Sequence, residues 1–156
     1  MTIDKISSAK NTFATLCSML DNNEWKYEKD EENLCIDCGA QGEDLPIPIK
    51  IRIDAERQII LLLSLIPFSV NEDKRMETAV AVSIVNNLLV DGSFDYDITA
   101  GDLYFRMTNS FIDSDISEEA FKYMLYCSCM TIDEYNDKFL MLSKGLLPLD
   151  SFLKDE

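Results

Sequence analysis

The chain has 156 residues, of which 47% are hydrophobic, enough for one domain with a substantial core. With 14 basic and 29 acidic residues its net charge is −15, which argues against a nucleic-acid backbone or an anionic membrane surface as partner. Histidine is absent, which excludes Ser-His and Cys-His nucleophile pairs and imidazole metal sites. The acidic charge is typical of solvated faces, and an acidic surface for a basic partner is the alternative.

The first half of the chain predicts one helix followed by four strands. Apolar residues at helical spacing predict a helix over 4–21, and short strands are expected over 25–29 and 34–38. Residues 47–54 alternate isoleucine with other residues, which is typical of a strand with one buried face. Residues 58–66 are apolar on both faces, and such a strand needs cover on both sides.

The second half predicts a helix, a hairpin and a long helix. The first of these helices is expected over 72–90, with Asn71 or Ser69 as its cap. We assign to its core-facing stripe Met76, Ala79, Val80, Ser83, Ile84, Asn87 and Leu88. Residues 93–98 and 102–108 then alternate in polarity around a tight turn, as the two strands of a hairpin do.

The last helix is expected to start near Ser117 and to end at Lys144, with capping-box character at Asp115. Its core seam consists of Phe121, Leu125, Ser128, Ile132, Tyr135, Phe139 and Leu142. Neighbouring apolar residues make its apolar face wider than one sheet contact requires. We expect the apolar tail over 146–156 to dock on its own domain, and a docking peptide for another protein is the alternative.

No residue pattern in the chain carries recognisable catalytic or metal-binding chemistry. Cys35 and Cys38 have CxxC spacing but fall on opposite faces of a predicted strand, and Cys127 and Cys129 diverge by about 200° on a helix. The calcium-like segment 113–118 lacks the glycine that such a loop needs at its sixth position. We therefore expect no metal, no cofactor and no enzymatic activity. A hydrolase that uses carboxylates alone would need a cleft with raised pKa values.

Surplus apolar surface predicts association with protein. The strand over 58–66 and the last helix expose more apolar surface than one layer of helices can cover, so we expect a homodimer. The candidate interaction surface consists of Ile60, Leu62, Tyr123, Tyr126, Met130, Leu149 and Phe152. The tail could instead cover this surplus within one chain.

Several short segments recur in this order in a known family: Leu65-Ile-Pro-Phe68, Asp73-Lys-Arg75, Asn86-Asn-Leu-Leu-Val90, Gly92-Ser-Phe-Asp95 and Asp102-Leu-Tyr-Phe-Arg106. On these residues the chain resembles the YbjN-type domain, a family described as bacterial sensory-transduction regulators, from about Trp25 to Leu142. The apolar tail after Gly145 and the five cysteines depart from the family pattern.

The resemblance implies a fold like that of type III secretion chaperones, whose members are small, acidic, often dimeric and bind other proteins. It carries over no catalytic residue. We therefore expect one α+β domain over 1–156, a twisted antiparallel sheet with flanking helices in the order α-β-β-β-β-α-β-β-α. The expected function is that of a non-enzymatic, protein-binding or chaperone-like module of a bacterial cytoplasm, since the sequence has neither a signal peptide nor a membrane span. A regulatory adaptor in signalling or stress response is the alternative.

Overall fold

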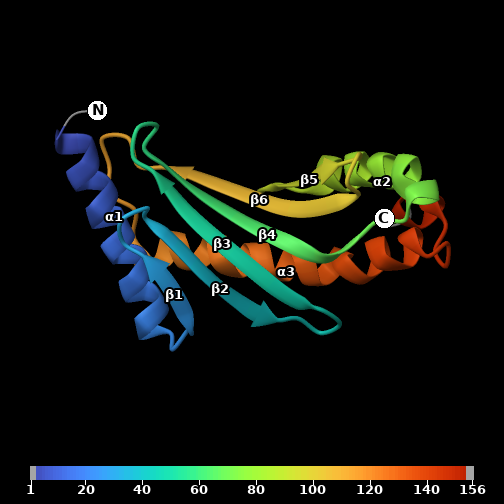
Figure 1. The fold of residues 1–156 in the computed structure, drawn as a ribbon, viewed down its shortest axis with the longest axis horizontal. Helices are drawn as coiled ribbons and strands as arrows, with labels where there is room; N and C mark the ends of the chain where they lie inside the picture. Colours follow the sequence, from blue (N-terminus) through green and yellow to red (C-terminus); the bar gives the residue numbers. More distant parts are fainter. Residues whose placement is uncertain (1–2, 154–156) are drawn as a thin grey trace.

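The computed structural model describes residues 3–153, and its element order confirms the predicted α+β arrangement (Figure 1). Two short 3-10 helices, η1 and η2, accompany the main elements. The bounds are α1 Ile3–Asn22, β1 Tyr27–Asp30, β2 Cys35–Gln41, β3 Pro46–Asp54, β4 Ile59–Ser69, η1 Glu72–Lys74, α2 Arg75–Leu88, β5 Ser93–Asp97, β6 Asp102–Ser110, α3 Glu118–Ser143 and η2 Leu149–Phe152.

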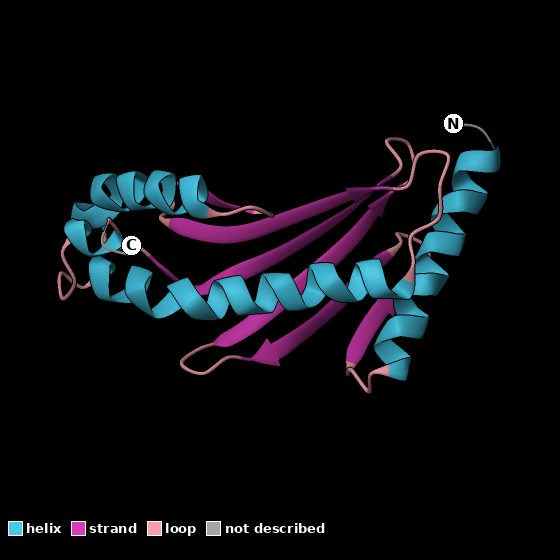
Figure 2. Ribbon diagram, turned by 180° about the vertical axis from the view of Figure 1, so that it is seen from behind, coloured by secondary structure: helices cyan, strands magenta, loops and turns pink. Residues whose placement is uncertain are grey.

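The six strands form one twisted antiparallel sheet in the order β1-β2-β3-β4-β6-β5. The long helix α3 crosses one face of this sheet, with α1 at one end of the helix and α2 at the other (Figure 2). In the opposite view no helix lies over the sheet (Figure 1). The described chain therefore has a covered face and a bare face.

The hydrophobic core lies between α3 and the covered face. The predicted alternation of β3 is confirmed, because its isoleucines are buried while Pro48, Lys50 and Arg52 are exposed. Every residue of the predicted α3 seam is buried as well. At its centre the ring of Phe94 meets the rings of Tyr135 at 5.9 Å and Phe139 at 5.3 Å. Edge-to-face pairs of this kind add about 0.5–1.5 kcal/mol each beyond the burial of their area.

Small polar residues let α3 approach the sheet closely. Ser64 of β4 and Ser128 of α3 are both fully buried, and their hydroxyl oxygens lie 3.2 Å apart in a hydrogen bond. This bond satisfies two groups whose burial without partners would cost free energy. A larger side chain at either position would push the helix away from β4.

The tail after α3 returns to the core. Gly145 has a φ of +69°, which a glycine adopts without strain, and the Leu146 N–H donates to the carbonyl of Met141 at 2.8 Å. Phe152 is 2% exposed and its ring lies 5.4 Å from that of Phe139. The structure thus docks residues 149–152 on the domain, and the last part of the predicted tail, 154–156, lies outside the described residues.

The predicted core stripe of α2 was wrong. The buried residues of this helix are Thr78, Ala81, Val82 and Val85. Asn86 explains the rotation, because its side-chain amide donates to the Phe94 carbonyl at 2.9 Å and accepts from the Phe94 N–H at 2.8 Å. These two bonds turn the Asn86 side of α2 towards β5, so most of the stripe that we assigned to the core faces solvent.

Two predicted helix caps were also wrong. The side chain of Asn71 makes no cap and instead donates to the Ser143 carbonyl at 2.9 Å, which ties the start of η1 to the end of α3. Ser117, and not Asp115, caps α3, since its hydroxyl accepts from the Ala120 N–H at 3.1 Å.

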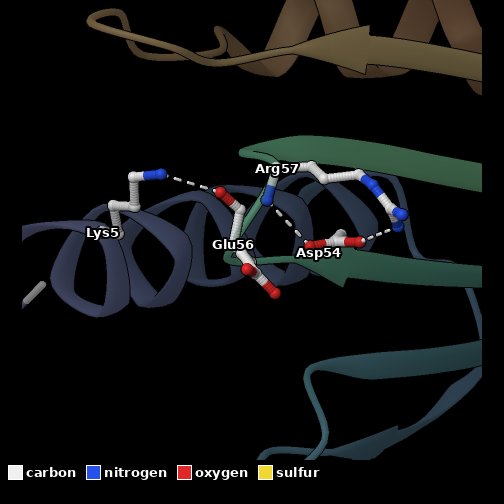
Figure 3. A network of polar contacts seen from close by, with 4 residues as sticks. All are labelled: Lys5, Asp54, Glu56 and Arg57. Atoms are coloured by element: carbon white, nitrogen blue, oxygen red, sulfur yellow. Dashed lines mark hydrogen bonds and ion pairs between the residues drawn. The ribbon is translucent and has the colours of Figure 1, made fainter. Parts of the chain in front are cut away.

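The turn between β3 and β4 is held by its own polar contacts and fastens α1 (Figure 3). The carboxylate of Asp54 accepts from the Arg57 backbone N–H at 2.9 Å and from its guanidinium at 3.0 Å. The backbone N–H is the main cause that lowers the pKa of Asp54. Lys5 of α1 donates to the Glu56 carbonyl at 2.9 Å, which links the first turns of α1 to this hairpin.

Candidate protein-interaction surfaces

A row of apolar side chains lies along β4 on the bare face. The row consists of Ile59, Leu61, Leu63 and Leu65, and we refer to it as the leucine row. Leu65 is 44% exposed and the other three are partly buried. Arg52 of β3 is the register neighbour of Leu61.

Cations border the leucine row on both sides. Lys50 of β3 and Arg106 of β6 are the register neighbours of Leu63. Lys50 lies 3.4 Å from Asp37 of β2, and Arg106 lies 2.9 Å from Asp95 of β5. Arg52, in contrast, forms no ion pair with any residue between 3 and 153.

A second apolar surface lies on the helices. Met76 is 72% exposed, Val80 and Leu88 are each 48% exposed, and Val90, just after α2, is almost fully exposed. No charged residue occurs between 78 and 90, although 28% of the whole chain is charged. A partly solvent-facing stretch of 13 residues without charge is unusual for so acidic a protein, and exposed apolar surface of this kind is typical of sites that another protein covers.

Three further exposed apolar residues, Tyr123, Tyr126 and Met130, lie on α3. The hydroxyl of Tyr123 donates to the carboxylate of Asp91. Because Asp91 directly follows Val90, this hydrogen bond joins α3 to the segment just after α2. This bond raises the pKa of Tyr123 to about 12, so the hydroxyl stays protonated. We call the combined surface the helical patch; its residues are Met76, Val80, Leu88, Val90, Tyr123, Tyr126 and Met130.

The structure keeps four of the seven predicted interaction residues at or near the surface. Tyr123, Tyr126 and Met130 are exposed and Leu149 is partly buried, whereas the other three residues are in the core: Ile60, Leu62 and Phe152. For β4 we chose the wrong face, because both faces are apolar and α3 covers the one with Ile60 and Leu62. The exposed residues of α2 were missed for a similar reason, although the charge-free run from 78 to 90 could have revealed them.

The cysteines are poor candidates for metal or redox chemistry. Cys35 and Cys38 lie on opposite faces of β2, as the strand spacing predicts. Burial is the main cause that raises the pKa of Cys38 to about 12 and of Cys129 to about 11, so both thiols are protonated at neutral pH. Within residues 3–153, no three cysteine or carboxylate side chains are grouped to hold a metal ion.

Nothing in the described part of the chain favours a hydrolase that uses carboxylates. The carboxylates there with a clearly displaced pKa are Asp30, Glu31 and Asp54, and each pKa is lowered, mainly by hydrogen bonds. A general acid would need a raised pKa. None of the described helices is long and apolar enough to cross a membrane.

Comparison with known proteins gives a family and a fold. The model of the YbjN family, described as "Putative bacterial sensory transduction regulator", matches residues 12–141. No curated protein matches the chain.

Three solved structures share the fold at low identity. The ExsC–ExsE complex is 13% identical with a TM-score of 0.62, over 84% of this chain and 95% of that chain. YbjN from E. coli is 16% identical with a TM-score of 0.58, over 81% and 92%. The HopA1–SchA chaperone–effector complex is 14% identical with a TM-score of 0.54, over 83% and 94%.

Proposed function

The chain belongs to the YbjN family, and from this premise we propose that it is a non-enzymatic, chaperone-like module that binds another protein. The observation that carries the proposal is the one-sided architecture, in which helices cover one face of the sheet and the leucine row remains on the other. A row of aliphatic side chains facing water costs free energy that a partner would recover. Two of the similar structures are complexes with a partner, which supports a binding role.

We also propose that two copies associate through the helical patch. Each chain carries a net charge of −15, so copies repel each other at long range and can meet most easily where charge is absent. The stretch 78–90 of the helical patch meets that condition, and Tyr123, Tyr126 and Met130 enlarge its apolar area. A homodimer of this kind leaves the leucine row of both copies available. The bacterial cytoplasm is the proposed compartment, since all five cysteines are free thiols.

A regulatory adaptor is the second candidate, and the description of the family as a sensory transduction regulator favours it. The two functions differ in what happens to the partner. A chaperone-like module keeps its partner soluble until release, whereas an adaptor changes the activity of a partner that is stable alone. Expression of the partner with and without this protein, followed by measurement of its solubility and activity, distinguishes them.

The binding function is tested by affinity capture from the native host with three forms of the protein. Leu65→Asp places a charge in the leucine row, and Ile112→Asp places one at an exposed site in the loop after β6, where Ile112 is 57% exposed. We expect one protein to be captured by the wild type and by Ile112→Asp, and to be lost with Leu65→Asp. Equal capture by all three forms, or none by any, would contradict the proposed site.

A further inference from the structure

The charges that border the leucine row set it apart from the rest of this acidic chain. Of 14 basic residues, Lys50, Arg52 and Arg106 stand next to Leu61 and Leu63 in register. The acids that pair with two of these cations, on β2 and β5, lie one strand further from the row. Among the residues in register with the row, cations therefore outnumber acids, although Lys50 and Arg106 are each paired with an acid one strand away.

One acid does touch the row, but it is already engaged. Asp54 is the register neighbour of Ile59 at the end of the row, and it holds the guanidinium of Arg57 at 3.0 Å. Arg52 remains the one bordering cation without an ion pair among the described residues. Its planar guanidinium is suited to a carboxylate supplied from outside.

The shape of the row favours a helix as occupant. Successive row residues are two positions apart on a strand, so their side chains repeat every ~6.6 Å and the row from Ile59 to Leu65 is about 20 Å long. Residues four apart on a helix repeat every ~6 Å, and about 13 helical residues span 20 Å. An extended segment laid on this face would leave its backbone N–H and C=O groups unpaired, whereas a helix satisfies its own.

A second copy of this chain fits the row poorly. Two leucine rows face to face would bring Lys50, Arg52 and Arg106 of each copy towards the same cations of the other, and like charges at a contact are repulsive. The α2 part of the helical patch, residues 78–90, carries no charge and suits a second copy better.

We infer that the leucine row binds an amphipathic helix of a partner protein, about 13 residues long, whose apolar stripe is flanked by Asp or Glu. The inference rests on the proposed protein-binding function and names the chemistry of the partner. The apolar stripe covers Leu61, Leu63 and Leu65, while the flanking carboxylates pair with Arg52 and compete for Lys50 and Arg106. The leucine row provides the affinity, and the bordering cations select a partner helix whose flanks are negatively charged.

The test uses three fluorescent model helices of 14 residues. The first has leucine at positions i, i+4, i+7 and i+11 with glutamate on both flanks, the second has lysine in place of glutamate, and the third has serine in place of leucine. Fluorescence anisotropy measures their binding to the wild type and to three variants, Leu65→Asp, Arg52→Glu and Lys10→Glu. Lys10 is exposed on α1, so its variant makes the same charge change as Arg52→Glu away from the row.

We expect the glutamate–leucine helix to bind the wild type and Lys10→Glu equally, and to bind Leu65→Asp at least tenfold more weakly. Arg52→Glu should weaken it by about three- to tenfold, because an attractive pair of about 0.2–1 kcal/mol becomes repulsive. The same variant should strengthen the lysine–leucine helix. The serine helix should not bind.

Tighter binding of the lysine helix to the wild type, lost with Leu65→Asp, would overturn the inference while the binding function stands. Equal effects of Arg52→Glu and Lys10→Glu on binding would overturn it too, because the substitution of Arg52 would then weaken binding only by making the whole protein more negative. If Leu65→Asp dissolves a dimer, the occupant is a second copy. If Leu65→Asp changes neither the model helices nor the captured partner, the inference and the proposed site both fail.

Discussion

Replacing Asn136 with leucine should stabilise the protein. Asn136 lies on α3, is fully buried, and neither its amide nitrogen nor its amide oxygen has a hydrogen-bond partner in the described structure. A buried polar group left unpaired costs about 1–3 kcal/mol. Leucine has the same side-chain branching as asparagine, with two methyl groups in place of the amide oxygen and nitrogen, and it leaves no polar atom unpaired. These methyl groups take up more space than the amide, and we expect the removal of the unpaired amide to outweigh the cost of fitting them. We expect the free energy of unfolding to rise by about 1–3 kcal/mol.

The assay is urea unfolding followed by circular dichroism, at one protein concentration so that association contributes equally to each form. For a domain of this size each kcal/mol corresponds to about 2–4 °C in Tm, so the variant should melt about 2–12 °C higher. Asn86→Leu is the matched control with the opposite sign. It removes both hydrogen bonds to the Phe94 backbone and should lower stability by about 2 kcal/mol or more.

A loss of stability in Asn136→Leu would refute the reasoning. It would mean either that the amide has a partner in solution, for instance a buried water that is costly to remove, or that the larger leucine overpacks the core. An unchanged m-value is required as well, because a changed slope would show that the unfolded state or the cooperativity had altered.

Three further predictions concern association and charge. Light scattering should find a dimer for the wild type and Leu65→Glu and a monomer for Val80→Glu; a wild-type monomer would contradict the helical patch as a dimer contact. The Tm should rise between low salt and 0.5 M sodium chloride, because screening over ~10 Å at 0.1 M relieves the repulsion of a chain with net charge −15, and a flat or falling Tm contradicts this. The pKa of Asp54 is lower in the folded state than in the unfolded state. The ionised Asp54 therefore stabilises the fold fully above its unfolded pKa of about 4, and this stabilisation is lost as the pH falls through the folded-state pKa. The stability gap between wild type and Asp54→Asn should therefore close on acidification, and a constant gap would show that Asp54 is not responsible.

The elements could be predicted from the sequence wherever one polarity period dominates. The isoleucines of β3 repeat every two residues and the α3 seam repeats at steps of four and three, and both are buried as predicted. Prediction failed where two faces of one element are apolar. Helix α2 has two such stripes: the one through Thr78 and Val82 is buried, and the one through Met76 and Val80 is exposed. Asn86 lies between them, and its hydrogen bonds to Phe94 set which stripe faces the core. The periodicity of the sequence cannot reveal such a tertiary contact.

The candidate surfaces follow the same rule. The sequence shows that β4 is apolar on both faces, but it does not show which face meets α3. In the structure this is the face of Ser64, whose hydroxyl is hydrogen-bonded to that of Ser128 on α3. The cationic border was not foreseen, because Lys50, Arg52 and Arg106 come from two strands that are far apart in sequence. Only the registers of β3 and β6 with β4 bring them to the same row.

Asn86 also governs how the sheet ends. β5 is an edge strand, and at Phe94 its outward N–H and C=O groups are taken up by the Asn86 amide, which occupies the place of a further strand. The other edge, β1, has four residues, and Glu28, Lys29 and Asp30 among them are charged. Neither edge offers a long uncharged backbone ladder to a neighbouring molecule. Growth into fibrils by edge-to-edge pairing is thus disfavoured even at high concentration, and molecules meet through their faces, where side chains discriminate between partners.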